Sequence, residues 1–159
     1  MNPKRYKHLR RQLQRRMSWG QLALLGILVV SLINQLMLWA GINYHFLFSA
    51  AMPYYLNWVS DQLSSSGFTF VATVVTWALY VAYGLCMLRS HQRQWYWAGM
   101  ALYALDTILL VIFALTLLEN PLSCLIELLV HGGVLFVLLQ AWKARLMLHR
   151  MPPKMPRSQ

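Results

Sequence analysis

The chain has 159 residues, of which 58% are hydrophobic and only 11% are charged. A soluble domain carries roughly 25% charged residues, so this composition argues against both a soluble globular domain and a disordered chain. Lys and Arg total 14 against 4 Asp and Glu, which gives a formal net charge of +10 at pH 7. The composition therefore predicts a membrane protein with basic segments outside its apolar ones.

Four apolar stretches are each near the roughly 20 residues that a helix needs to cross a bilayer. They are Gln21–Ile42, Phe68–Leu88, Tyr96–Leu118 and Leu122–Trp142. Barrel strands would alternate polar and apolar residues, and runs such as residues 22–30 do not alternate. We therefore predict an all-α fold, with a four-helix transmembrane bundle over residues 20–142. A basic arm (1–19) precedes it and a basic tail (143–159) follows it.

The basic residues predict the orientation of these helices. Two lie between the second and third apolar stretches, five follow the fourth, and the connections on the other side carry none. By the positive-inside rule both termini are cytoplasmic, in the plasma membrane of a bacterium (the bacterial inner membrane). Seven basic residues precede the first stretch and are predicted to contact anionic lipid: Lys4, Arg5, Lys7, Arg10, Arg11, Arg15 and Arg16.

The amino-terminal arm has two interpretations. Tyr6, Leu9, Leu13 and Met17 recur at helical spacing, with basic residues on the other faces. Such an amphipathic helix suits the surface of an anionic inner leaflet. It also suits a solvated extension of the first transmembrane helix. No nucleic-acid-binding motif accompanies the charge, so nucleic acid is not an expected partner.

The first outer connection, residues 43–67, is rich in aromatic residues that favour the headgroup level of a membrane. Within it, Ala50–Leu63 is predicted to form a short helix with Pro53 in its first turn. We expect this helix to cover the bundle at the membrane interface. The alternative is a segment that re-enters the bundle.

Cys86 and Cys124 fall near opposite ends of their predicted helices, and the chain has no CxxC motif. We expect them to stay unpaired and to act as small apolar side chains.

Polar residues inside the apolar stretches are the candidates for function. The second stretch places five hydroxyl residues on one helical stripe, at positions 69, 73, 76, 80 and 83. Asp106 and His131 fall at similar depths on consecutive antiparallel helices, at about 1.5 Å per residue. The candidate ligand or ion site comprises Asn34, Gln35, Tyr80, Tyr103, Asp106, Glu127 and His131.

The ionisable members of this set are the strongest indication of a functional site. An ionised Asp at the centre of a transmembrane helix costs on the order of 2.5–3.5 kcal/mol, so Asp106 should face inward and find a partner. We predict that partner to be His131. Asp106, Glu127 and His131 together could also bind a divalent metal such as zinc.

These features support two functions of different kinds. The first is handling of a small ligand or ion at a buried polar site, in a transporter-like or channel-like homo-oligomer. The second is a non-catalytic accessory subunit that binds another membrane protein and whose polar seam is structural. Catalytic motifs such as HExxH and GxSxG are absent, which argues against an enzyme. Gly132-Gly133 is expected to allow close helix approach, within the bundle or between subunits.

Three short segments carry a family resemblance: Tyr103-Ala104-Leu105-Asp106-Thr107, Glu127–His131 and Ala141-Trp142-Lys143. They resemble a group of small four-helix membrane proteins of Firmicutes. The resemblance implies a bacterial host and a four-helix membrane fold. That group has no established activity to carry over.

Overall fold

A computed structural model describes residues 3–42, 49–63, 65–116 and 121–151, and every element in these ranges is a helix. The helices are α1 (Pro3–Trp39), α2 (Ala51–Leu63), α3 (Ser66–Leu88), α4 (Arg93–Thr116) and α5 (Pro121–Arg150). Four of them, α1, α3, α4 and α5, are long and apolar enough to cross a membrane. The predicted all-α architecture with four candidate membrane helices is therefore confirmed.

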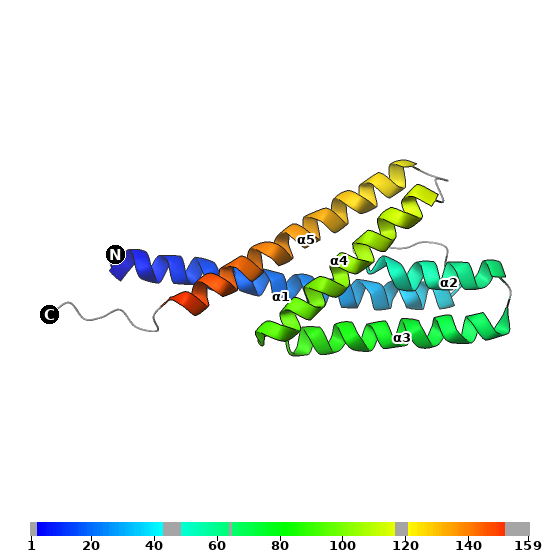
Figure 1. The fold of residues 1–159 in the computed structure, drawn as a ribbon, viewed down its shortest axis with the longest axis horizontal. Helices are drawn as coiled ribbons and strands as arrows, with labels where there is room; N and C mark the ends of the chain where they lie inside the picture. Colours follow the sequence, from blue (N-terminus) through cyan, green and yellow to red (C-terminus); the bar gives the residue numbers. More distant parts are fainter. Residues whose placement is uncertain (1–2, 43–48, 64, 117–120, 152–159) are drawn as a thin grey trace.

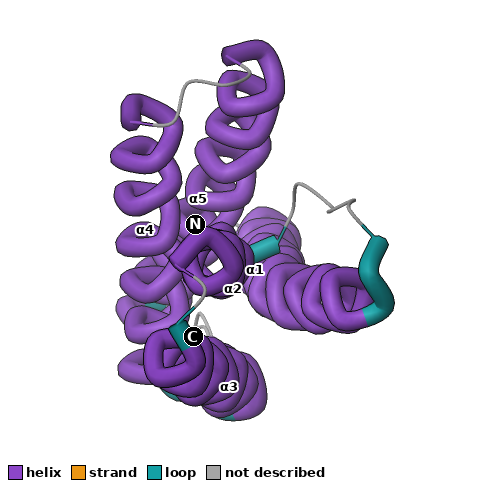
Figure 2. Tube along the Cα trace, turned by 90° about the vertical axis from the view of Figure 1, so that its right-hand side faces the viewer, coloured by secondary structure: helices purple, strands orange, loops and turns teal. Residues whose placement is uncertain are grey.

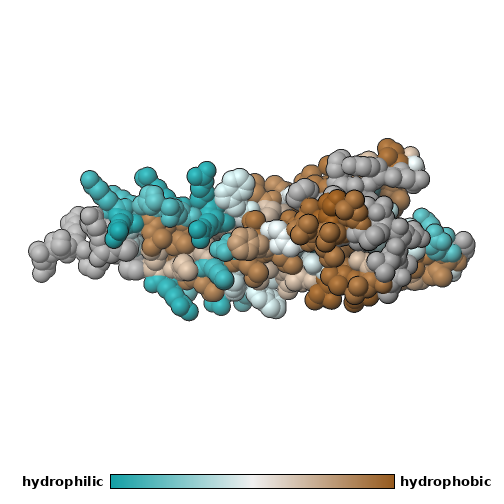
Figure 3. All heavy atoms as spheres, turned by 90° about the horizontal axis from the view of Figure 1, so that it is seen from above, coloured by the Kyte–Doolittle hydropathy of each residue, from teal (hydrophilic) through white to brown (hydrophobic). Residues whose placement is uncertain are grey.

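Helices α1, α2 and α3 lie roughly along one axis, and α4 and α5 cross it obliquely (Figure 1). Hydrophilic side chains gather mainly at one end of this axis (Figure 3). We call this end the basic end. It consists of the start of α1, the turn between α3 and α4, and the end of α5. Toward the opposite end, α4 and α5 diverge from α1 and α3 (Figure 1). The apolar side chains exposed on α3, α4 and α5 form the surface that lipid would cover.

The amino-terminal arm continues α1 without a break, because α1 runs from Pro3 to Trp39. Of the predicted apolar stripe, Tyr6 and Leu13 are buried within the chain, whereas Leu9 is 38% exposed. The arm thus follows the second interpretation, a helical extension of the first membrane helix. All but one of its seven Lys and Arg side chains are exposed, and Arg10 is partly buried.

Among the described helices, α1 and α5 have the most extensive contact, and Gly20 allows them to cross closely. A Cβ atom at position 20 would lie 2.3 Å from both the Ala141 Cβ and the Tyr96 hydroxyl oxygen. That hydroxyl donates a 3.0 Å hydrogen bond to the Leu138 carbonyl of α5. The apolar core extends from this crossing and includes Leu24, Ile27, Tyr83, Tyr96, Tyr103, Leu138 and Ala141.

The glycine pair on α5 plays no such part within the chain. Gly132 and Gly133 are exposed, and a Cβ at either position would meet nothing within 4 Å. The expectation that they allow close helix approach inside the bundle is wrong, because both face outward. Their use between subunits stays a prediction.

Helix α2 begins inside the bundle, and this differs from the expected interfacial cover. It contacts α1, α3 and α4, and lies among them when the molecule is viewed along its long axis (Figure 2). The Ala51 amide meets the Asp106 carboxylate. Asp106 lies about 20 Å along α4 from Arg93, at 1.5 Å per residue. Helix α2 therefore starts about midway along α4 and runs to the start of α3. That it re-enters the membrane stays a prediction.

Three aromatic residues of the same connection, Tyr44, Phe46 and Phe48, lie outside the described residues. Cys86 is buried and free, in agreement with the prediction. The side chain of Cys124 lies outside the described part, so its pairing stays a prediction.

We expect Gly20→Ala to lower the free energy of unfolding by about 1–3 kcal/mol, because the added methyl group overpacks the α1–α5 crossing. Gly26→Ala on the same helix is the control, since a Cβ there meets nothing within 4 Å. It should leave stability unchanged or raise it by up to about 1 kcal/mol through helix propensity. Thermal unfolding of both variants, followed by circular dichroism, checks this. Equal melting temperatures would contradict the close crossing.

Candidate functional site

The candidate site is built around the side chain of Asp106, which is 2% exposed. Its Oδ2 accepts a 2.8 Å hydrogen bond from the Ala51 amide, and its Oδ1 accepts a 2.7 Å bond from the Met52 amide. These amides belong to the first turn of α2, where a helix has no acceptors of its own. A carboxylate at this position also offsets the positive end of the helix dipole. Asp106 thus caps α2 from a neighbouring helix.

The remaining backbone groups at the start of α2 are also accounted for. The Ala50 amide donates a 2.7 Å hydrogen bond to the Ser31 hydroxyl, which itself donates to the Ile27 carbonyl at 2.6 Å. Pro53 has no N–H to satisfy. Every backbone position from 50 to 53 is therefore either hydrogen-bonded or free of a donor. This is the condition for starting a helix away from water.

His131 lies directly against the capping carboxylate. Its Nε2 is 3.5 Å from the Asp106 Oδ2, and the imidazole is fully buried. Its Nδ1 is 3.0 Å from the Glu127 carbonyl oxygen. A carbonyl can only accept, so Nδ1 carries the hydrogen and Nε2 presents its lone pair toward Asp106 in the neutral ring. A second proton on His131 would convert this contact into an ion pair.

Tyr103 completes the buried face of the site. Its ring stacks on the His131 imidazole, with centroids 5.1 Å apart and planes at 3°. Within the described part of the chain, the Tyr103 hydroxyl, His131 Nε2 and the Thr76 hydroxyl have no hydrogen-bond partner. Buried polar atoms without a partner are uncommon in proteins. The Tyr103 hydroxyl and His131 Nε2 therefore leave hydrogen-bonding groups unused within the site.

A second polar group lies toward the outer end of the same region. The Gln35 side-chain oxygen accepts hydrogen bonds from Asn57 at 3.1 Å and from the Tyr80 hydroxyl at 3.2 Å. Farther out, Ser60 of α2 donates to Thr69 of α3 at 2.8 Å. Beside the start of α2 is a cavity of about 10 Å³, the room one water molecule needs. It is lined by Ser31, Asn34, Gln35, Leu38, Ala50, Tyr54 and Tyr80.

The structure brings together most of the residues singled out in the sequence. Asp106 and His131 are neighbours as predicted, although the main partners of Asp106 are backbone amides. Of the five residues in the predicted hydroxyl stripe of α3, Thr76, Tyr80 and Tyr83 are buried, whereas Thr69 is exposed and Thr73 is partly exposed. Glu127 is buried one turn before His131 and interacts electrostatically with it.

The predicted metal site is not assembled. Among the described residues, no group of three or more His, Cys, Asp and Glu side chains is placed to hold a metal ion. Both Asp106 oxygens accept hydrogen bonds from the start of α2, so a metal ion there would have to compete with the Ala51 and Met52 amides.

Sequence reasoning missed the backbone of residues 50–52 and the side chain of Asn57 as parts of the site. A signal for the former was available. Pro53 predicts the first turn of a helix, yet the preceding Ala50, Ala51 and Met52 offer no side-chain cap. A helix that begins this way needs acceptors from elsewhere in the chain. Comparison with known proteins adds no further guide, because no family model, curated protein or solved structure matches the chain.

We expect Asp106→Asn to lower the free energy of unfolding by about 1–3 kcal/mol, because the new amide nitrogen cannot accept from an α2 amide. Ser31→Ala should cost a similar amount, since it leaves the Ala50 amide without its acceptor. Thr73→Ala is the control, because that hydroxyl donates to the Thr69 carbonyl of its own helix and takes no part in the cap of α2. Denaturant unfolding in detergent micelles measures all three. If the Asp106→Asn variant were as stable as the Thr73→Ala control, Asp106 would not hold the start of α2 in place.

Proposed function

We propose that this chain is a multi-pass membrane protein that handles protons or a small cation at the Asp106–His131 pair. One observation carries the proposal: His131 Nε2 lies 3.5 Å from the Asp106 Oδ2, with both side chains at most 2% exposed. An ionisable pair inside a membrane is costly, and its default role is in an ion or proton pathway. A proton shared between His131 Nε2 and Asp106 Oδ2 would neutralise the negative charge of the Asp106 carboxylate. This charge is what makes the pair costly to bury in a membrane.

The burial of the pair supports a small ligand. Small organic ligands occupy pockets of roughly 300–1,000 Å³. The cavity beside the start of α2 has about 10 Å³, and neither Asp106 nor His131 lines it. Because both side chains are at most 2% exposed, the pair favours a proton or a single small ion over an organic substrate.

The position of α2 supports a pathway that opens outward. Half-helices that begin inside the bilayer are a recurring feature of the binding sites of membrane transporters. From its start at Asp106, α2 leads past Asn57 to the Ser60–Thr69 contact. These polar groups follow one line from the buried pair toward the end where α3 begins.

The same geometry links site occupancy to the position of α2. Asp106 Oδ2 accepts from the Ala51 amide and also faces His131. A proton or cation held between Asp106 and His131 competes with the Ala51 amide for this oxygen. Occupancy of the site would thus loosen the start of α2, which supplies a conformational step for transport.

The proposal extends to the setting of the protein. The basic end faces the cytoplasm of a bacterium and the protein lies in the plasma membrane, as the positive-inside distribution supports. The exposed Gly132-Gly133 surface of α5 offers a contact for a second copy in a homo-oligomer.

A second candidate function is that of an accessory subunit with a purely structural site. The observation in its favour is that both Asp106 oxygens accept backbone hydrogen bonds, which is a structural task. Under this alternative the protein would move no ions. Substitutions at the site would then change stability alone.

Proton flux into liposomes separates the two candidates. The purified protein is reconstituted with a trapped pH-sensitive dye, and a potassium diffusion potential drives the flux. We expect wild-type protein to acidify or alkalinise the lumen according to the sign of the potential. His131→Gln should slow this flux at least about tenfold, the effect of a 1.4 kcal/mol higher barrier. His8→Gln, at an exposed position on α1, should leave it unchanged.

Sodium and potassium gradients in the same vesicles test the small-cation form of the proposal. Absence of proton and cation flux in the wild-type protein would contradict the proposal and favour the accessory subunit. Equal flux in His131→Gln and His8→Gln would exclude His131 from the pathway.

A further inference from the structure

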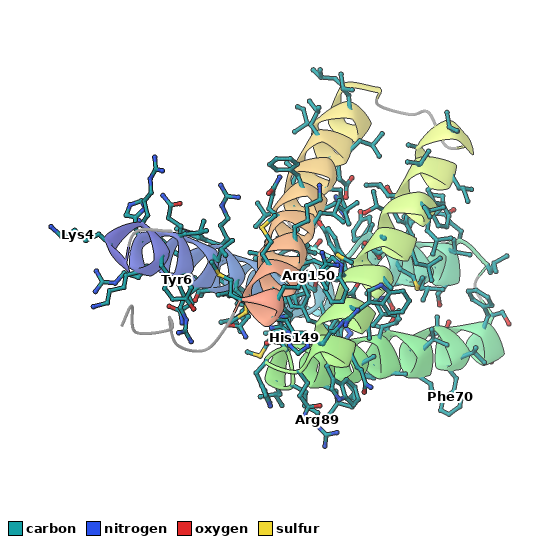
Figure 4. The ribbon with its side chains drawn as sticks, turned by 60° about the vertical axis from the view of Figure 1, so that its left-hand side comes forward. Lys4, Tyr6, Phe70, Arg89, His149 and Arg150 are labelled. Carbon is teal, nitrogen blue, oxygen red and sulfur yellow. The ribbon has the colours of Figure 1, made fainter. Side chains whose placement is uncertain are left out.

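The basic end holds a pocket of about 480 Å³, far from the Asp106–His131 pair along the helices. Three separate parts of the fold line it: the arm of α1, the turn before α4 with its first residue, and the end of α5. Its polar lining residues are Arg10, Gln14, His91, Arg93, Arg145 and His149. Figure 4 places His149 at the end of α5, near the α3–α4 turn that carries Arg89, with Lys4 well away at the tip of α1.

Among the described residues, no acidic side chain lines this pocket. Its four acidic residues are Asp61, Asp106, Glu119 and Glu127. Asp61 lies on α2, Asp106 on the middle of α4 and Glu127 near the start of α5. Position 119 falls in the connection between α4 and α5, outside the described residues. Three arginines and two histidines thus converge with no carboxylate among the lining residues.

Arg145 is held in place at the inner wall of the pocket. Its residue is 8% exposed, one guanidinium nitrogen donates to the Ser90 carbonyl, and the guanidinium carbon lies 4.9 Å from the Tyr96 ring centre. In the described part of the chain, its Nη1 is a buried donor without a hydrogen-bond partner. A fixed guanidinium with a spare donor is suited to binding phosphate oxygens.

Arg93 also lines this pocket, and it lines a neighbouring one together with Trp142. Its side chain is exposed, and its guanidinium carbon lies 5.3 Å from the centre of the Trp142 ring. The remaining lining side chains are apolar: Met17, Leu146, Leu148 and Met151. The pocket therefore combines a cationic wall with an apolar one, and its volume suits a group larger than a simple ion.

We infer that this pocket binds a phosphate-bearing ligand, with Arg93 and Arg145 contacting the phosphate oxygens. The phosphate could belong to the headgroup of an anionic phospholipid, since basic pockets between membrane helices bind such headgroups. It could also belong to a soluble phosphate compound. The inference is independent of the function proposed for the Asp106–His131 pair, and it concerns a site distinct from the exposed basic residues of the arm.

Arg93→Gln and Arg89→Gln form a matched pair for the test. Both arginines flank the α3–α4 turn, both are exposed, and both lie over a tryptophan ring, at 5.3 Å and 5.0 Å. Only Arg93 lines the pocket. Both substitutions remove one positive charge, so any difference between them reports the pocket rather than net charge.

The lipid arm uses nanodiscs with equal phosphatidylglycerol and phosphatidylcholine, and native mass spectrometry counts the retained lipids. The phosphate arm titrates inorganic phosphate into protein in neutral detergent and follows tryptophan fluorescence. We expect binding in at least one arm. Arg93→Gln should weaken the affinity roughly tenfold, because a charge-assisted hydrogen bond is lost, and Arg89→Gln should leave the affinity unchanged. Arg145→Gln, with its fold checked by circular dichroism, should weaken binding at least as much.

If the protein prefers phosphatidylglycerol, and Arg93→Gln but not Arg89→Gln weakens this preference, the pocket binds a lipid headgroup. If the protein binds phosphate with the same difference between the variants and shows no lipid preference, the pocket binds a soluble compound. The inference is overturned if neither probe binds, or if Arg89→Gln weakens binding as much as Arg93→Gln does.

Discussion

The fold depends on how a helix can begin inside an apolar bundle. The carboxylate of Asp106 accepts hydrogen bonds from the Ala51 and Met52 amides, at 2.8 and 2.7 Å. Ser31 supplies the acceptor for the Ala50 amide, and Pro53 has no N–H to satisfy. Without these acceptors, each unsatisfied amide in the bilayer interior would cost several kcal/mol. One side chain of α4 thus allows a short half-helix to lie among three longer helices.

The Asp106 carboxylate has two different kinds of partner. Its Oδ2 is shared between a structural partner, the Ala51 amide, and an ionisable one, His131. The structural cap and the proposed ion site therefore share the same atoms, so we expect stability and the proposed function to respond together to changes there. The phosphate pocket inferred at the basic end uses other residues and can vary independently. The protein thus divides into a polar centre and a cationic end, joined by the crossing of α1 and α5 at Gly20.

Much of this arrangement was predictable from the sequence. Apolar length predicted the four long helices, and depth counting brought Asp106 and His131 together, because helix rise per residue is constant. The inward stripe of Thr76, Tyr80 and Tyr83 followed from helical periodicity. The depth of α2 was not predicted, since a 13-residue apolar helix suits the interface as well as the interior. Its cap was missed because the contact joins a side chain to backbone amides 54 and 55 residues away, which no side-chain pattern records.

Hydrogen exchange at the start of α2 tests whether the Asp106 carboxylate caps a buried half-helix. NMR of the protein in nanodiscs can follow the Ala51 and Met52 amides individually, with the amide of Gln62 at the exposed outer end of α2 as the internal reference. The account predicts slow exchange at residues 51 and 52 in the wild-type protein, relative to residue 62, and faster exchange in Asp106→Asn. Exchange at residues 51 and 52 as fast as at residue 62 in the wild-type protein would contradict a buried, carboxylate-capped half-helix.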